Sequence, residues 1–309
     1  MAAVTKAVVK KVGIVGYGKL GQYLAASIIE APASAGLEIA FVWNRTASKI
    51  REDGKIKDSL VLEDLGAFAE RGADLIVEVA HPAITEEYGA KFLEHADFFC
   101  GSPTCFADRK LEERIRAAAE NPTGHGLYVP AGALWGAMDI QKMAARGQLK
   151  GLKVTMKKHP SSFRVYGEVA EKLAAVHATA AKDGEGEGDV AKALEGPPGE
   201  HVLYEGPVRA LCPLAPNNVN TMACAALASG DALGFDGTQA LLIADYSLEA
   251  HVIEIDVKGP EKGWGDAFRV STLRHNPAKP GAVTGNATYA SFYSSLVLAG
   301  GRGDGVHLC

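Results

Sequence analysis

Short apolar runs alternate with amphipathic stretches over the N-terminal part of the chain. The runs have the length of buried strands, and the residues between them repeat apolar positions at helical spacing. Strands that alternate with helices in this way are typical of a doubly wound parallel sheet. The fold class is therefore predicted as α/β. The predicted strands are Val12–Val15, Leu37–Trp43, Asp74–Ala80, Asp97–Cys100 and Leu127–Val129.

The pattern changes from about Trp135, where short strands follow one another with fewer helices between them. This change predicts a second, α+β domain with a mixed or antiparallel sheet. A last helix over Ala282–Leu298 is expected to pack back across the domains. We therefore divide the chain at 1–134, 135–281 and 282–309. The predicted strands of the second domain are Leu152–Met156, Val202–Tyr204, Ala240–Ala244, Val252–Val257 and Phe268–Leu273.

A glycine-rich turn, Gly16-Tyr17-Gly18-Lys19-Leu20-Gly21, links the first predicted strand to the first helix. In this setting Gly16 permits the tight turn, Gly18 lets a pyrophosphate approach the backbone, and Gly21 lets the helix pack closely on the strand. Free N–H groups and the positive dipole end at the helix start attract phosphate. The turn thus predicts a Rossmann-type domain at 1–134 that binds NAD or NADP, with Gly16, Gly18, Lys19, Leu20 and Gly21 as contact residues.

Asn44 and Arg45 end the second strand, where an Asp or Glu usually binds the adenosine ribose. That acid is missing from this chain. Asn44 can still hydrogen-bond the ribose, and Arg45 can meet a 2′-phosphate, although an arginine at a strand end is equally often a solvated charge. The preference between NAD and NADP stays open.

Residues that follow the later strands of a parallel sheet lie at its ligand-binding rim. Ala80 and His81 follow the third strand, Ser102 follows the fourth, and the turn 130–133 follows the fifth. We expect Ala80, His81 and Ala133 near the nicotinamide. His81 precedes a proline, so a structural role in the loop is an equal alternative.

Composition narrows the class of protein. The net charge of −5 over 309 residues gives no electrostatic signature of a nucleic-acid or anionic-membrane partner. No apolar run reaches the ~18 residues of a membrane-spanning helix, and the N-terminus lacks the pattern of a secretory signal. The five cysteines lack metal spacing and suit reduced thiols, so we expect a cytoplasmic protein with no metal site. The acidic, glycine-rich segment 183–189 is expected to be a flexible loop.

Two polar features of the second domain could carry substrate chemistry. Asn217, Asn218 and Asn220 precede a helix of small residues, where they are either helix caps or amide groups that face a nicotinamide or a substrate carboxylate. His251 begins a strand and is suited to exchange a proton near neutral pH, although a lone histidine at a strand edge is usually structural.

Ordered motifs run along nearly the whole chain: VGIVGYGKLGQ, FVWNR, VEVAHP, GSPTCFAD, GALWGAMDI, LYEGPVRALCP, APNNVNTMA, NPAKPGAVTG and the terminal HLC. With these motifs the chain resembles the L-aspartate dehydrogenase family, in particular its animal members. The resemblance implies oxidation of L-aspartate to iminoaspartate with NAD or NADP by a homodimer. The imine then hydrolyses to oxaloacetate and ammonia, or feeds NAD biosynthesis.

The resemblance also assigns roles to single residues. The alanine that meets the cofactor is Ala133, the Asn-x-Asn motif falls on Asn218 and Asn220, and the proposed catalytic histidine is His251. The chain departs from the family pattern between Asp245 and His251, where the spacing is shorter and Tyr246 replaces a proline.

The chemistry needs a base to neutralise the substrate amino group and cationic or amide donors for two carboxylates. We expect His251 to be the base, and Lys158, His159 and Asn217 to bind carboxylate, although lysines at a strand end are more often solvated. Two alternatives stay open. One is an oxidoreductase of the same fold that acts on another amino acid, such as homoserine, or on a cyclic imine. The other is a non-catalytic NAD(P)-binding redox sensor.

Overall fold

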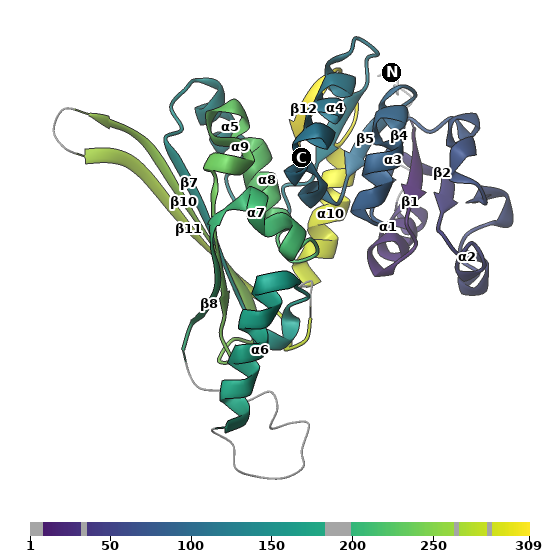
Figure 1. The fold of residues 1–309 in the computed structure, drawn as a ribbon. Helices are drawn as coiled ribbons and strands as arrows, with labels where there is room; N and C mark the ends of the chain where they lie inside the picture. Colours follow the sequence, from purple (N-terminus) through teal and green to yellow (C-terminus); the bar gives the residue numbers. More distant parts are fainter. Residues whose placement is uncertain (1–8, 32–35, 183–198, 263–265, 283–285) are drawn as a thin grey trace, which may run out of the picture. The chain divides into compact units, whose positions relative to one another are not determined.

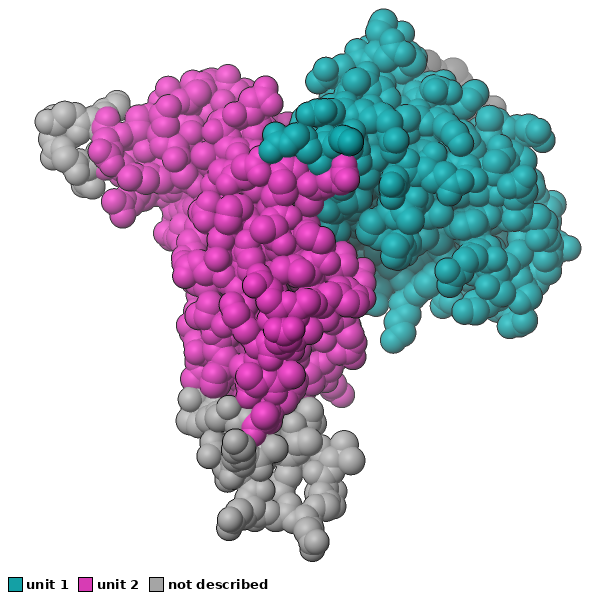
Figure 2. All heavy atoms as spheres, in the orientation of Figure 1, with its two compact units in different colours: residues 1–105, 109–130, 289–309 teal, residues 106–108, 131–288 magenta. Residues whose placement is uncertain are grey.

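A computed structural model describes residues 9–31, 36–182, 199–262, 266–282 and 286–309, and the predicted loop at 183–189 lies outside them (Figure 1). The chain divides into two compact units, which are coloured separately in Figure 2. Unit 1 comprises Met1–Cys105, Arg109–Pro130 and Tyr289–Cys309. Unit 2 comprises Phe106–Asp108 and Ala131–Thr288.

Unit 1 contains a seven-stranded sheet in the order β12-β6-β5-β4-β1-β2-β3, and every neighbouring pair is parallel. The strand order reverses between β1 and β4, which is where such sheets bind ligands. The predicted doubly wound sheet is therefore confirmed. The strands are β1 (Lys10–Val15), β2 (Leu37–Trp43), β3 (Val61–Leu62), β4 (Leu75–Glu78), β5 (Asp97–Cys100), β6 (Gly126–Val129) and β12 (Gly305–Leu308).

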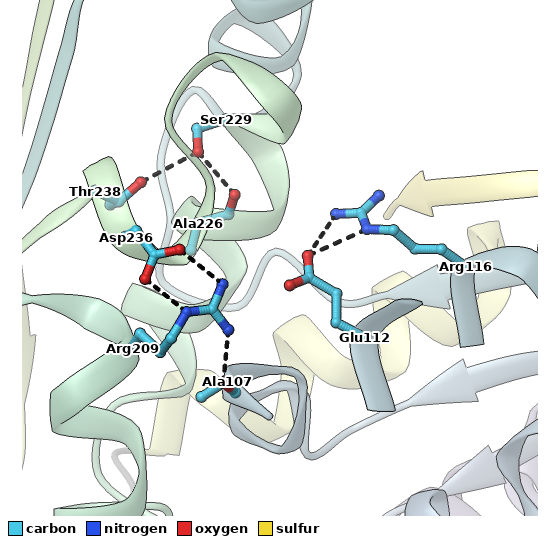
Figure 3. Close-up of polar contacts among 8 residues, drawn as sticks. All are labelled: Ala107, Glu112, Arg116, Arg209, Ala226, Ser229, Asp236 and Thr238. Atoms are coloured by element: carbon cyan, nitrogen blue, oxygen red, sulfur yellow. Dashed lines mark hydrogen bonds and ion pairs between the residues drawn. The ribbon is translucent and has the colours of Figure 1, made fainter. Parts of the chain in front are cut away.

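Helices α1, α3 and α4 of unit 1 pack against this sheet. In α1, for example, Gly21, Leu24, Ala25 and Ile28 are buried at the spacing of one helical face. In α4, Arg116 forms an ion pair with Glu112 one turn away at 3.1 Å (Figure 3). The helices are α1 (Lys19–Glu30), α2 (Ser48–Asp53), α3 (Pro82–Leu93), α4 (Arg109–Glu120) and α10 (Asn286–Leu298), with short 3₁₀ turns at Asp58–Leu60, Leu65–Arg71 and Pro103–Ala107.

The C-terminal segment adds a strand that the apolar pattern did not predict. Val306 and His307 of β12 pair in parallel with β6, and the Ser295 hydroxyl of α10 donates to the Cys309 carbonyl at 2.8 Å. Phe292 of α10 packs against Phe99 of β5 with ring centroids 6.1 Å apart. The chain thus returns at its C-terminal end to complete the parallel sheet of unit 1.

Unit 2 contains a five-stranded mixed sheet in the order β11-β10-β7-β9-β8. Among the described strands of this unit, only the β7–β9 pair is parallel, which confirms the mixed sheet predicted for the second domain. Helices α5, α7, α8 and α9 lie along one face of this sheet (Figure 1). The strands are β7 (Gly151–Lys158), β8 (His201–Pro207), β9 (Gln239–Ala244), β10 (Ala250–Lys262) and β11 (Asp266–Pro277). The helices are α5 (Ala137–Ala145), α6 (Gly167–Lys182), α7 (Val208–Leu211), α8 (Asn220–Ala228) and α9 (Gly230–Gly237), with 3₁₀ turns at Pro160–Ser162 and Cys212–Leu214.

Small residues let the central helix of unit 2 pack on all sides. Every residue of α8 from Met222 to Ala228 is buried, and most of them are alanine. Arg209 holds the surrounding layer together, because it donates to both carboxylate oxygens of Asp236 at 2.7 and 3.2 Å and to the Ala107 carbonyl at 2.6 Å (Figure 3). The buried Ser229 hydroxyl contacts Thr238 Oγ1 at 3.1 Å (Figure 3).

Candidate functional site

The glycine-rich turn has the geometry of a phosphate cradle. Gly16 has φ +114°, and a Cβ there would lie 2.8–2.9 Å from Ala80. A Cβ on Gly21 would lie 1.9 Å from the Gly16 carbonyl oxygen, so this position admits no side chain without a shift of α1. Gly18 instead has nothing within 4 Å of its missing Cβ. The turn is therefore closed on the protein side and open over Gly18, which fits the close approach of a pyrophosphate.

Asn44 joins the end of β2 to this turn. Its Oδ1 accepts a hydrogen bond from the Tyr17 backbone N–H at 3.2 Å, and its Nδ2 donates to the Thr46 carbonyl at 2.9 Å. Arg45 is exposed, and within the described ranges it makes neither an ion pair nor a hydrogen bond. The asparagine thus shapes the ribose end of the site, while the guanidinium of Arg45 is available to solvent or ligand. Lys19 is also exposed, and Leu20 is half-buried.

Glu78 at the end of β4 is a site residue that the sequence reasoning missed. It is fully buried, and its Oε1 accepts from the backbone N–H groups of Ala80 and His81 at 2.7 and 2.8 Å. Burial raises the pKa of Glu78 to about 7. The two backbone hydrogen bonds and those from the nearby Ser102 lower the pKa, but they offset only part of the rise. The signal was an acid within the apolar run of a parallel strand, and its role is to hold the Ala80–His81 loop.

His81 lies exposed at the N-terminus of α3, where its Nδ1 accepts from the Ala83 N–H at 3.1 Å. This is a helix-capping contact, and it leaves Nε2 as the ring nitrogen that can meet a ligand.

In unit 2, Lys158 and His251 lie on the same face of the sheet. The antiparallel register pairs Ile253 with Met156 and Val252 with Lys157, so the next step places His251 opposite Lys158. Both side chains are buried. Burial lowers the pKa of Lys158 to about 8. Burial, and then the neighbouring charge of Lys158, lower the pKa of His251 to about 4.

The orientation of the His251 ring follows from one hydrogen bond. Its Nε2 lies 2.9 Å from the Ala282 carbonyl oxygen. A carbonyl only accepts, so Nε2 carries the proton and Nδ1 is the acceptor of the neutral ring.

Arg274 on β11 extends this cluster, and the sequence reasoning missed it. Its Nη1 donates to the Gly132 carbonyl at 3.0 Å, beside Ala133, and its Nε donates to Asn276 Oδ1 at 2.9 Å. Asn276 in turn pairs with His251 in the β10–β11 ladder. The only sequence signal was an arginine two residues before an asparagine on an edge strand, which becomes informative only through the strand register.

The three asparagines at the N-terminal end of α8 have different surroundings. Asn217 is exposed. Asn218 is 3% exposed, and its amide accepts from the Arg164 N–H at 2.8 Å and donates to the Ser162 carbonyl at 3.2 Å. Asn220 Oδ1 is buried and has no hydrogen-bond partner among the described residues. Such an orphaned acceptor suits a ligand that brings a donor, as an amide group does.

His159, which follows Lys158 in the chain, packs against Tyr246. The His159 Nδ1 lies 2.7 Å from the Ser161 hydroxyl, and the rings of His159 and Tyr246 meet edge to face with centroids 5.3 Å apart. The Tyr246 hydroxyl is 2.8 Å from His177 Nδ1. Asp245 closes the short connection to β10, because its Oδ1 accepts from the Ser247 N–H at 2.8 Å.

The described part of the chain contains no group of three His, Cys, Asp or Glu side chains that could hold a metal ion. No helix in it is long and apolar enough to span a membrane.

Comparison with known proteins places both units. Residues 139–295 match the family described as "Aspartate dehydrogenase, C-terminal", and residues 16–130 match "Homoserine dehydrogenase, NAD binding domain". The chain is 48% identical to the "Aspartate dehydrogenase domain-containing protein" of Danio rerio, over 97% of this chain and 98% of the relative. It is 27% identical to the "L-aspartate dehydrogenase" of Methanococcoides burtonii, over 81% of this chain and 83% of the relative.

Among solved structures, the aspartate dehydrogenase of Thermotoga maritima has a similar fold. The TM-score is 0.62 at 18% identity, over 93% of this chain and 95% of that chain.

Proposed function

This chain belongs to the aspartate dehydrogenase family and is a dehydrogenase that uses NAD or NADP, and we propose that its substrate is L-aspartate. The observation that carries the proposal is the cluster of Lys158, His251 and Arg274 on one face of the second sheet. A guanidinium and a buried amine beside a neutral imidazole suit a substrate that carries carboxylates and an amino group.

The cofactor belongs to unit 1 in this proposal. The open side of Gly18 receives the pyrophosphate, with Gly16, Lys19, Leu20 and Gly21 around it. Asn44 and Arg45 lie at the adenosine ribose, and Ala80 and His81 follow the switch point of the sheet. When bound, the nicotinamide accepts the hydride that leaves Cα of the substrate.

The substrate belongs to unit 2 in this proposal. Arg274 presents N–H groups for a carboxylate, and His159 and Asn217 stay predicted contributors to its binding. The buried Asn220 Oδ1 and the Gly132–Ala133 turn are the predicted cofactor contacts of this unit, together with Asn218. The unprotonated Nδ1 of His251 accepts a hydrogen bond from the substrate amine, and later from the water that adds to the imine. Hydrolysis then gives oxaloacetate and ammonia.

An absorbance assay at 340 nm tests the proposal. Purified protein is mixed with L-aspartate and either NAD or NADP at about pH 9, with L-alanine and L-homoserine as control substrates. A rise that requires aspartate supports the proposed reaction and also identifies the preferred cofactor. A rise with homoserine alone would move the substrate to another amino acid. Cofactor binding without any amino-acid-dependent rise would favour a redox sensor.

We also propose, on the resemblance alone, that the protein is a cytoplasmic homodimer and that its imine product can feed NAD biosynthesis. Light scattering of the purified protein tests the dimer, and cell fractionation tests the location. Trapping of iminoaspartate by an enzyme that consumes it tests whether the imine product can feed NAD biosynthesis.

A further inference from the structure

Two adjacent lysines at the end of β7 have opposite environments. Lys157 lies on the face of the sheet away from the helices, where its Nζ forms ion pairs with Glu200 and Glu254 at 2.6 and 2.8 Å. These carboxylates raise the pKa of Lys157. Lys158 points to the opposite face, as strand alternation requires, and only 4% of its surface is exposed. Lys157 is therefore an ion-paired cation, whereas its neighbour Lys158 is a buried amine.

His251 is poorly suited to take the first proton. Its Nε2–H is already donated to the Ala282 carbonyl, so only Nδ1 can accept. The burial and the Lys158 charge that lower the pKa of His251 to about 4 both oppose a second proton on the ring. At neutral and alkaline pH the ring is therefore a neutral hydrogen-bond acceptor, which orients a donor without removing its proton.

We propose that Lys158, and not His251, accepts the proton that the α-ammonium group of the amino-acid substrate releases before hydride transfer, with His251 as the residue that positions the amine. Lys158 lies one residue beyond the last printed pair of the β7–β10 register, Val252–Lys157, so continuation of that register brings it to His251, and its charge acts on the His251 ring. The inference rests on the proposed function. It also changes the predicted role of Lys158 from binding carboxylate to acid–base chemistry.

The proton and the electrons balance in this step. One N–H bond of the substrate ammonium breaks, and its proton forms a new bond to Nζ of neutral Lys158. The lone pair left on the substrate nitrogen then forms the C=N bond, while the Cα–H bond breaks and both its electrons go to the oxidised nicotinamide. The positive charge only moves from one nitrogen to the next, so the buried site gains no net charge during proton transfer.

The surroundings of Lys158 are consistent with this role. The titratable side chains that strand pairing and chain sequence bring next to Lys158 include His251 on β10, Asp245 after β9 and the adjacent His159, and Arg274 lies on the same face of the sheet. Burial outweighs them, because it is what lowers the pKa of Lys158 to about 8. Enzymes commonly tune a lysine into this range for use as a base.

Substitution of Lys158 by Arg and by Met distinguishes two roles of this side chain, a base that accepts a proton and a cation that binds carboxylate. Arginine keeps the positive charge but does not release its proton, so both variants should lose kcat by roughly 10²–10⁴-fold. Lys158→Met should also lose the rise of kcat/KM through pH about 8, whereas His251→Asn should keep it. Methylamine added to Lys158→Ala should restore part of kcat. Lys157→Met is the matched control and should keep kcat within a few-fold.

Three kinetic outcomes would overturn the inference: a Lys158→Arg enzyme with kcat near that of the wild type, an unchanged pH profile in Lys158→Met, or loss of the pH-dependent limb in His251→Asn alone. Thermal unfolding and NADH binding of each variant show whether it folds. Nuclear magnetic resonance of ¹³C-lysine-labelled protein reads the titration of Lys158 directly, by comparison with Lys158→Met. A Lys158 pKa near 10 would overturn the inference even if the wild type oxidises no amino acid, which is the separate failure of the proposed function.

Discussion

The glycine-rich turn of unit 1 and the lysine–histidine cluster of unit 2 are built in different ways. In the turn, the decisive atoms are backbone atoms of residues 16–21, and the fit depends on where a side chain is absent. In the cluster, the decisive atoms are side chains of Lys158, His251 and Arg274, which only the strand register brings together. A site made of backbone follows from local spacing, whereas a site made of side chains follows from long-range pairing.

The largest expected effect comes from Gly18 in the turn. Gly18→Val should abolish NAD and NADP binding without loss of stability, because its φ of −78° suits any residue and its Cβ would point into open space. That space is the one the pyrophosphate must enter. Isothermal titration with NADH measures the binding, and urea unfolding measures the stability.

Gly21→Ala is the contrasting variant in the same turn. Its added methyl group would overlap the Gly16 carbonyl, so we expect a loss of about 1–3 kcal/mol in the free energy of unfolding. Full NADH affinity in Gly18→Val would refute the cradle. An unchanged unfolding midpoint in Gly21→Ala would refute the close packing of α1.

Asn218 and Asn220 allow a similar comparison within unit 2, between a residue that stabilises the fold and one that is available to a ligand, with smaller expected effects. Asn218→Ala should cost about 2 kcal/mol of stability, because it removes the hydrogen-bond partners of the buried Ser162 carbonyl and the partly buried Arg164 N–H. Asn220→Ala removes an acceptor that has no partner among the described residues, so it should leave stability nearly unchanged and weaken ligand binding. Urea unfolding and NADH titration of both variants check this. A reversed pattern would assign the ligand contact to Asn218.

The sequence predicted backbone features well and distant side-chain contacts poorly. The strands Leu37–Trp43 and Asp97–Cys100 were predicted with their observed ends, because continuous apolar runs mark strands buried on both faces. β12 was missed, because Gly305–Leu308 is a short stretch with three glycines just before it and has no apolar run. Its pairing with β6 depends on a fold that returns the C-terminal segment to the first sheet.

The candidate site shows the same limit. Glu78 and Arg274 were not predicted, since an acid within an apolar strand and a cation on an edge strand are weak signals until the contacts that they make are known. Lys158 and His251 were predicted separately, but their proximity depends on a register between strands about a hundred residues apart in the chain. The environment that separates their pKa values is a property of the packed sheet and its helices.

The smallest expected effect concerns Arg45, where the choice between NAD and NADP rests on one exposed side chain. Arg45→Ala should weaken NADP binding by about tenfold and change NAD binding less than twofold, because only NADP carries the 2′-phosphate that a guanidinium binds. Since an exposed ion pair is screened by salt, the wild type should also lose NADP affinity between 50 and 500 mM NaCl, and the variant should not. Titration with both cofactors at the two salt concentrations measures this. Equal losses for NAD and NADP would mean that Arg45 supports the fold of the loop, and no loss for either would leave it a solvated charge.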